Sequence, residues 1–510
     1  MWTSIVYLTL IALLWYLIAS VLAWYPLRKF QGPFLASFSY LWLFHANYKG
    51  DRWRRVHELQ QKLTESSASG KGSLLRIGPN LLITDHPDIL RRMSTVRSTY
   101  TRGGWYDAVR LHPDNPSMFG SRDTAWHDDV KARTAAGYSG REIPNLEKDV
   151  DNVITQLKTY IREKHVFKNK KGTQGKLLDF TNTSGYFALD VISKIAFGNE
   201  FGFLAADADV NGYLAALDIF APALSLFADI PWMRAILANR WVFETFGPKA
   251  TDEKGPGRIM GLAKRAVDER FGGKGGFRDL EDMLGSFLRH GITRYQCEAE
   301  GVLQITAGSD TTSNVIRATM MYLATTPTAY RRLQQEIDEA VKSGKASSPI
   351  ITSAGAKALP YLQAVLLEGL RIHPPTLILA SKQVPPEGDT IGGKFIPGGT
   401  EIAQNSWTML RNKTIFGQDA DLFRPERWLE ESDAETKAEM ERTAGLMFGH
   451  GRWMCAGKSI AMMELGKLFF ELFREFDFQV ADPTRPWEMK QFSIFMFKGL
   501  LMRVTEREEA

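Results

Sequence analysis

The order of apolar and polar positions predicts a chain that is mainly helical. Apolar residues recur at the spacing of one helix face in several long segments, and segments with this period form amphipathic helices. The clearest of these segments are residues 145–162, 184–196, 279–290, 296–324 and 327–342. We therefore expect most of the core to be built from packed helices.

Short β-strands accompany the predicted helices. Within residues 72–87, apolar runs flank the Gly-Pro-Asn cluster at 78–80, a pattern typical of two strands joined by a turn. Further strands are expected over residues 391–402, and residues 493–504 predict a hairpin that turns at 498–499. The predicted fold class is therefore mainly α with small β-sheets.

The N-terminal segment is predicted to be a transmembrane helix. Residues 1–25 carry no charged side chain and are long enough to cross a bilayer core, which needs about 20 apolar residues. Arg28 and Lys29 follow this segment, so the short N-terminus is expected in the lumen and the rest of the chain in the cytosol. A cleaved signal peptide is the weaker alternative, because the segment lacks a basic start. We expect a single-pass protein of the endoplasmic reticulum membrane.

The remaining chain is predicted to form one large unit. Residues 26–34 contain prolines and are expected to be a hinge, and residues 35–510 to be a single catalytic domain. The polar segments 270–279 and 343–357 are predicted to be surface loops within that domain. With 44% hydrophobic and 24% charged residues among 510, the composition is that of a globular protein.

Charge and cysteine content exclude two classes of protein. The net charge of +5 is not gathered in a basic stripe, so we expect no binding to nucleic acid. The only two cysteines are Cys297 and Cys455, which rules out a disulfide framework. Cys297 lies at the start of a helical pattern and is expected to pack in the interior.

Cys455 lies in a glycine-rich loop that runs directly into an amphipathic helix. A thiolate at a helix N-terminus is stabilised by the helix dipole and by free backbone N–H groups. Gly449, Gly451 and Gly457 are expected to let a flat ring approach the backbone, and Phe448 supplies an apolar cover. Taken alone, the cysteine could equally be a buried packing residue.

This loop resembles the haem-binding loop of the cytochrome P-450 family, whose fold and chemistry the resemblance then implies. It implies that the Cys455 thiolate is the axial ligand of the iron of haem b. Family members usually have Arg or His two residues before this cysteine, where the present chain has Trp453, with Arg452 one place earlier. Either Arg452 reaches a haem propionate, or Trp453 offers its indole N–H while other cations supply charge. We favour Trp453.

Residues 307–313 are similar to the part of the family's long helix that lies beside the oxygen-binding site. In the family, this helix opens locally beside the iron, and an acid with a neighbouring hydroxyl delivers protons to oxygen. Ala307 and Gly308 match the opening, and Asp310 and Thr311 match the proton-delivering pair. Without the resemblance, such a run would be interpreted as a solvent-facing or capping cluster.

Two further segments match the family in order and spacing. Glu368 and Arg371 share one helix face, and the resemblance implies that they form a buried structural cluster with Arg427 rather than an ordinary surface ion pair. His127 and Lys131 match the helix that reaches the haem edge, so they are expected to contact a propionate, although a solvated charged face is the alternative.

The resemblance implies a monooxygenase that inserts one oxygen atom from O2 into a hydrophobic small molecule. Electrons from NADPH are expected to arrive through an NADPH-cytochrome reductase, because the chain has no nicotinamide or flavin fingerprint. An acidic partner is expected to dock near Lys131, Arg133, Arg452 and Lys458, and the protein is expected to be a monomer. A haem-thiolate isomerase or dehydratase and a non-catalytic haem carrier are the alternatives, and the Asp-Thr pair argues against both.

The substrate is only loosely constrained. The chain looks most like fungal pisatin-demethylase-type members of the family, which implies a role in secondary metabolism. By analogy with the family, an apolar and partly aromatic substrate pocket is expected to be lined by Trp105, Tyr106, Phe220, Leu377, Leu379 and Phe495, each of which could equally be core packing.

Overall fold

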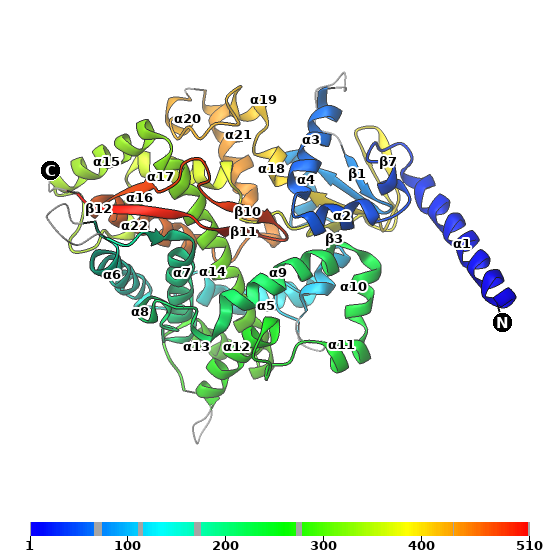
Figure 1. Ribbon diagram of the computed structural model, residues 1–510, viewed down its shortest axis with the longest axis horizontal. Coiled ribbons are helices and arrows are strands. Elements are labelled where there is room, and N and C mark those ends of the chain that lie inside the picture. Colours follow the sequence, from blue (N-terminus) through cyan, green and yellow to red (C-terminus); the bar gives the residue numbers. More distant parts are fainter. Residues whose placement is uncertain are drawn as a thin grey trace.

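Helix α14 (Arg294–Ala324) runs through the middle of the molecule in the computed structural model, which describes residues 2–65, 74–110, 116–167, 175–271, 278–431 and 433–507 (Figure 1). It packs against α7 (Phe180–Phe197), α12 (Gly255–Phe271) and α17 (Pro360–Ile372). The largest hydrophobic cluster surrounds it, with fully buried side chains that include Phe187, Ile305, Leu366 and Phe469. The core is therefore helical, as the periodicity predicts.

The predicted helices are found, with ends shifted by a few residues. Residues 145–162 fall in α6 (Leu146–Lys164), residues 279–290 contain α13 (Met283–Arg289), and residues 327–342 form α15 (Pro327–Lys342). The other helices of the described chain are α1 (Trp2–Trp24), α2 (Leu41–Lys49), α3 (Arg52–Glu65), α4 (Pro87–Ser94), α5 (Thr124–Tyr138), α8 (Phe203–Ala206), α9 (Tyr213–Asp229), α10 (Pro231–Ala238), α11 (Arg240–Phe246), α16 (Ser353–Lys357), α18 (Ser406–Met409), α19 (Lys413–Phe416), α20 (Arg427–Glu430), α21 (Ala434–Gly445) and α22 (Lys458–Glu475). Short 3-10 helices are η1 (Tyr25–Leu27), η2 (Leu35–Ser37), η3 (Gly104–Val109), η4 (Val210–Gly212), η5 (Leu446–Phe448) and η6 (Gly451–Trp453).

The strands form four small sheets. The largest has the order β1-β2-β8-β5-β3, where β2 and β8 are parallel and the other neighbours are antiparallel. A second sheet has the order β4-β12-β9, and the pairs β10-β11 and β6-β7 complete the set. The strands are β1 (Leu75–Gly78), β2 (Leu81–Thr84), β3 (Thr101–Arg102), β4 (Leu178–Asp179), β5 (Lys382–Gln383), β6 (Asp389–Ile391), β7 (Lys394–Ile396), β8 (Glu401–Gln404), β9 (Phe476–Val480), β10 (Glu488–Gln491), β11 (Phe495–Lys498) and β12 (Leu501–Glu506).

The predicted C-terminal hairpin is wrong. Two strands do flank Gly499, but β11 pairs with β10, whereas β12 pairs with β9 and β4. Gly499 has a φ of +77°, a left-handed conformation that glycine adopts without strain and that redirects the chain from one sheet to the other. Alternation of apolar residues identifies strands but does not reveal which strands pair.

Two other predictions need correction. The segment 343–357 is not entirely loop, because α16 occupies its end, capped by Thr352, whose side chain accepts a hydrogen bond from the Gly355 N–H. Most of the predicted glycine-rich loop at 270–279 lies outside the described residues.

The apolar N-terminal segment folds as α1, which projects from the body of the molecule (Figure 1). Among the described residues, no helix combines the length and hydrophobicity needed to cross a membrane, so the expected span is not confirmed.

Candidate active site

The loop before α22 presents Cys455 at an exposed position. The Cys455 backbone N–H donates to the Phe448 carbonyl oxygen at 2.6 Å and closes the loop. Gly449 has a φ of +76°, and a Cβ there would lie 2.5 Å from the Trp453 carbonyl oxygen. Gly451 has a φ of +58°, and its Cβ would lie 2.3 Å from a backbone oxygen of a neighbouring segment. Close backbone contacts within the protein therefore already require glycine at both positions.

The surroundings of the Cys455 sulfur act on its charge in opposite directions. Burial is the largest effect and raises the pKa of the thiol, while the backbone N–H groups of Gly457 and Lys458 and the charge of Lys131 lower that pKa. A Cβ at Gly457 would meet nothing within 4 Å. Cys455 is thus an exposed residue whose sulfur is nevertheless desolvated, and the N–H groups of Gly457 and Lys458 favour its charged form, which fits a thiolate ligand.

Unsatisfied donors gather around Trp453. The indole Nε1 of Trp453 and the Nζ of Lys382 are buried, and neither has a hydrogen-bond partner within the described chain. The Lys382 Nζ lies 3.7 Å from the centre of the Trp453 ring, and the Arg102 guanidinium lies 4.4 Å from it. The His127 ring lies tilted against the Trp453 ring, with 4.5 Å between ring centres and 43° between their planes. Although the Asp128 carboxylate binds His127 at 2.9 Å, the buried Trp453 and Lys382 donors have no carboxylate partner in the described chain, which fits the propionates of haem.

The same crowding of cations perturbs the titrating groups. Burial, reinforced by the charge of Arg102, lowers the pKa of His127 to about 4 and lowers the pKa of Lys382 well below its usual range. An anion bound here would reverse part of this effect, because opposite charge favours the charged form of a cation. A negative group bound here would therefore raise the pKa values of His127 and Lys382 back toward their usual range.

Arg452 and Lys131 bind carbonyl and carboxylate groups of the protein instead of joining the group around Trp453. The Arg452 guanidinium donates to the Val96 carbonyl oxygen and lies 3.6 Å from the Asp128 carboxylate. The Lys131 ammonium donates to the carbonyl oxygens of Arg452 and Met454 at 2.6 and 2.8 Å. Lys131 thus ties α5 to the cysteine loop, a role that its spacing in the sequence does not indicate.

The expected acid and hydroxyl lie in successive positions of α14. Asp310 is 8% exposed, and burial raises the pKa of its carboxyl to about 7. The Thr311 hydroxyl donates to the Ala307 carbonyl oxygen at 2.8 Å, and Ala307 itself is exposed. A Cβ at Gly308 would lie 2.6 Å from Ile192, so this glycine allows close packing of α14 against α7. The helix is continuous here and shows no local opening.

The structure brings Glu368, Arg371 and Arg427 together in the interior. Arg371 binds the Glu368 carboxylate through two hydrogen bonds of 2.8 Å, and Arg427 adds a third of 3.0 Å. The Trp428 indole also donates to this carboxylate at 3.0 Å. Burial opposes the charge of Glu368, yet these cations hold its pKa below the usual range.

The six residues expected to line a substrate pocket are not brought into one cluster. Trp105 is buried with its indole donating to Asp229 at 2.9 Å, and Phe495 is buried among aromatic rings. The six divide between separate hydrophobic clusters, with Trp105, Tyr106 and Leu379 in one, Leu377 and Phe495 in a second, and Phe220 packed against the largest. Core packing accounts for the buried ones.

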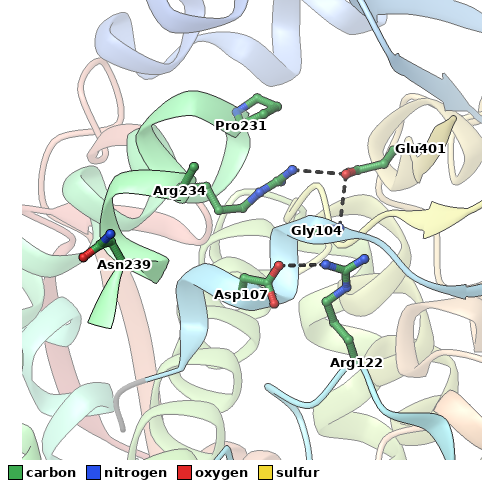
Figure 2. A pocket seen from close by; sticks show the side chains of 8 residues that line it. Gly104, Asp107, Arg122, Pro231, Arg234, Asn239 and Glu401 are labelled. Carbon is green, nitrogen blue, oxygen red and sulfur yellow. Dashed lines mark hydrogen bonds and ion pairs between the residues drawn. The ribbon is translucent and has the colours of Figure 1, made fainter. Parts of the chain in front are cut away.

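A cavity of about 450 Å³ opens between η3 and α10, and its lining is polar (Figure 2). Arg234 pairs with Glu401 at 3.1 Å, and Arg122 pairs with Asp107 at 2.8 Å. The Gly104 N–H also donates to Glu401 at 3.1 Å. The four charges that line the cavity are therefore paired with one another. Its other lining residues are Pro231, Ala235 and Asn239.

Sequence reasoning missed two residues of this site, Arg102 and Lys382. They face each other across the antiparallel pair β3-β5, although 280 positions separate them in the chain. Each strand is two residues long, so neither has a detectable alternation. An isolated basic residue in such a segment carries no local signal of its role.

Comparisons with known proteins agree with this geometry. A family model described as cytochrome P450 matches residues 38–504. Cytochrome P450 monooxygenase ABA1 of Pyricularia oryzae is 42% identical over 94% of this chain and 93% of its own length. Cytochrome P450 monooxygenase aba1 of Botryotinia fuckeliana is 43% identical over 95% and 92%, and a pisatin demethylase of Fusarium vanettenii is 30% identical over 95% and 90%.

A solved structure shows the same fold at low sequence identity. The cytochrome P450DA heme domain superposes with a TM-score of 0.69 over 90% of this chain and 93% of its own, at 18% identity. The mainly helical architecture with small sheets is therefore that of the P450 fold. The fold, the family match and the identities of 42% and 43% together show that this chain belongs to the cytochrome P450 family and is a P450 monooxygenase.

Proposed function

We propose that this enzyme uses haem b held by Cys455 to insert one oxygen atom from O2 into a hydrophobic small molecule. The pair Asp310 and Thr311 carries the proposal, because a buried carboxyl with a pKa of about 7 beside a hydroxyl is suited to deliver protons at neutral pH. Haem with a thiolate ligand supplies, when bound, the redox chemistry that activates oxygen. An isomerase, a dehydratase or a haem carrier has no need of such a pair. Residues 35–510 would form the catalytic unit, joined to α1 by the 26–34 hinge.

The first test concerns the iron ligand. Cys455→Ser should abolish the spectral signature that a thiolate ligand gives to the carbon monoxide complex of the reduced protein. Cys297→Ala is the matched control, because Cys297 is buried and its thiol has a pKa raised to about 12. Loss of the signature in both variants, or in neither, would contradict the assignment of Cys455.

The second test concerns proton delivery. Asp310→Asn should lower the rate of product formation with added reductase by about 100-fold, the low end of what general acid catalysis contributes. Glu300→Gln is the control, because Glu300 is also buried on α14 and also has a pKa raised to about 7.

The unmodified protein tests the class of reaction. If product forms at the rate at which NADPH is consumed, the protein is a monooxygenase rather than an isomerase or a carrier.

For the haem propionates, we propose Trp453 and Lys382 as the principal donors, with Arg102 supplying positive charge and the His127 ring packed beside Trp453. The unpartnered Nε1 and Nζ support this choice. Arg452 is less suited, since its guanidinium is engaged with Val96 and Asp128.

We further propose that electrons arrive from an NADPH-cytochrome reductase that docks on the face formed by Lys131, Arg133, Arg452 and Lys458. Lys458 is exposed at the start of α22, where it can attract an acidic partner. Lys458→Glu should raise the reductase concentration needed for half-maximal turnover several-fold, most strongly at low salt. Lys342→Glu on α15 makes the same charge change elsewhere. Equal effects of the two changes would argue against this docking face.

We propose a place in fungal secondary metabolism and attachment to the endoplasmic reticulum membrane as a monomer, with the N-terminus luminal. Relatives named pisatin demethylase support the first. Helix α1 projects from the body of the molecule (Figure 1). Its exposed apolar side chains, such as Leu8 and Leu14, support the second. Changing both to Lys should release the protein from the membrane fraction, whereas Leu422→Lys, on the catalytic body, should not.

A further inference from the structure

The Asp310 carboxyl lies on the side of α14 that faces α9. Tyr213, the first residue of α9, is fully buried, and its hydroxyl donates to Asp310 Oδ2 at 3.1 Å. The Thr311 hydroxyl, by contrast, donates to the carbonyl oxygen of the exposed Ala307, and within the described chain no hydrogen bond joins it to α9. The acid and the hydroxyl of the proton-delivering pair therefore have different neighbours, and the acid is held by a residue outside the motif.

Ser309 completes a small network around the same carboxyl. The hydroxyls of Tyr213 and Ser309 are 3.1 Å apart, and Ser309 Oγ lies 3.3 Å from Asp310 Oδ1. The Ser309 hydroxyl also lies 2.6 Å from the Ile305 carbonyl oxygen, to which it donates. Ser309 has one hydroxyl proton for two acceptors, Ile305 and Asp310, whereas the Tyr213 hydroxyl can donate either to Asp310 or to Ser309.

This network can satisfy Asp310 in both protonation states. When the carboxyl is ionised, the Tyr213 hydroxyl donates to Oδ2. When it is protonated, Asp310 can donate to the Tyr213 oxygen while the Tyr213 hydroxyl turns to Ser309. Asp310 Oδ2 therefore keeps the Tyr213 hydroxyl as its partner in either state, so the free-energy cost of moving a proton on or off the carboxyl is kept small.

We propose that Tyr213 is a positioning residue that holds the Asp310 carboxyl on the α9 side of α14 and allows it to gain and lose its proton there. This inference rests on the proposed role of Asp310 in proton delivery. It also links that role to α9, because the donor to the carboxyl is the first residue of that helix.

The charges near Asp310 agree with this assignment. Burial raises the pKa of Asp310, while the Tyr213 hydrogen bond, the charge of Arg317 and the Ser309 contact lower it, with a result of about 7. Arg317, on α14, is anchored to α7 by bonds of 3.0 Å to the Thr181 carbonyl oxygen and 2.8 Å to Ser184. Because Arg317 is fixed by those partners, its effect on the Asp310 pKa is constant. The Tyr213 hydroxyl can rotate, so its effect on that pKa can change.

The test is an infrared titration of the resting holoenzyme, in which the carboxyl band of Asp310 is isolated by subtracting the spectrum of Asp310→Asn. Tyr213→Phe removes the donor to the ionised form and should move the titration midpoint up by about one pH unit, the size expected for one lost hydrogen bond to a charge. Tyr138→Phe is the matched control, because the Tyr138 hydroxyl donates to Glu300, the other buried acid of α14, at 3.0 Å. It should leave the Asp310 midpoint unchanged.

A second change keeps the inference testable if Tyr213→Phe fails to bind haem. Fluorotyrosine at position 213 is a stronger donor and should move the midpoint down. An Asp310 midpoint that stays fixed on either change, or that moves equally in Tyr138→Phe, would overturn the role of Tyr213. Full turnover by Asp310→Asn would instead overturn the proposed function, while the titration would still decide whether Tyr213 controls this carboxyl.

Discussion

At the scale of single residues, the two cysteines differ only in what surrounds them. Cys297 is 1% exposed among apolar side chains, and burial raises the pKa of its thiol to about 12. Cys455 is exposed at the start of a helix, where the N–H groups of Gly457 and Lys458 favour its charged form. The thiol of Cys297 is therefore inert, whereas the thiol of Cys455 is available to bind a metal.

Trp453 offers a prediction at this scale. Trp453→Phe keeps the ring that contacts Lys382, Arg102 and His127 but removes the unpartnered indole N–H. Loss of one hydrogen bond to a carboxylate costs about 1.5 kcal/mol, so the affinity for haem should fall about tenfold. The measurement is the rate of haem transfer to an excess of apomyoglobin.

Arg452→Gln is the companion variant for this prediction. Its guanidinium is directed to Val96 and Asp128, so haem transfer should be less affected than in Trp453→Phe. A larger effect of Arg452→Gln would mean that the neighbouring arginine, rather than the tryptophan, binds the propionate.

At the scale of elements, the buried carboxylate of α17 joins three segments of chain. Glu368 accepts hydrogen bonds from Arg371 on its own helix and from Arg427 and Trp428 on α20. Arg371 in turn donates to the carbonyl oxygens of Leu410 and Ala420 at 2.7 Å. Removal of the negative charge would leave two buried cations facing each other.

Glu368→Gln should therefore lower the free energy of unfolding by about 3–5 kcal/mol, as expected for one partner of a buried ion pair. Glu244→Gln on α11 removes one partner of the exposed pair with Arg240 and should cost less than about 1 kcal/mol. Urea unfolding of both variants measures the difference. Similar costs would show that the Glu368 cluster contributes no more than a surface pair.

The helices could be predicted from the sequence, whereas the strand pairing and one long-range contact could not. Helices such as α6 and α15 were predicted because each buries one face, and their apolar residues recur with that face. The pairing of β11 with β10, instead of with β12, depends on a single glycine conformation and on distant partners. The role of Lys131 as a link from α5 to the cysteine loop likewise depends on carbonyl groups more than 300 residues away.

At the scale of the whole molecule, several acids are buried with raised pKa values. Among them, Glu464 should make the folding stability depend on pH. It is 4% exposed on α22, its Oε1 has no hydrogen-bond partner within the described residues, and burial raises its pKa to about 8. The folded protein therefore holds a proton that the unfolded chain releases above about pH 4.3. This group favours the folded state at low pH, and that contribution is lost as the pH rises toward 8.

The pH dependence of stability should follow from Glu464. Between pH 5.5 and 7.5, the free energy of unfolding of the unmodified protein minus that of Glu464→Gln should fall by about 1.4 kcal/mol per pH unit. For Glu368→Gln the same difference should stay constant over this range, since the lowered pKa of Glu368 places its titration at more acidic pH. Parallel behaviour of the two variants would contradict this explanation.

The sheet β4-β12-β9 also determines when the fold can be completed during synthesis. Strand β12 is its central strand, and the neighbouring Leu500 N–H binds Thr181 Oγ1 across 319 residues of chain. The ribosome must therefore release residues 501–506 before residues 178–179 gain their partner strand. Until then, the unpaired edges of β4 and β9 are open to other chains, which makes nascent enzyme most dependent on chaperones just before translation reaches β12.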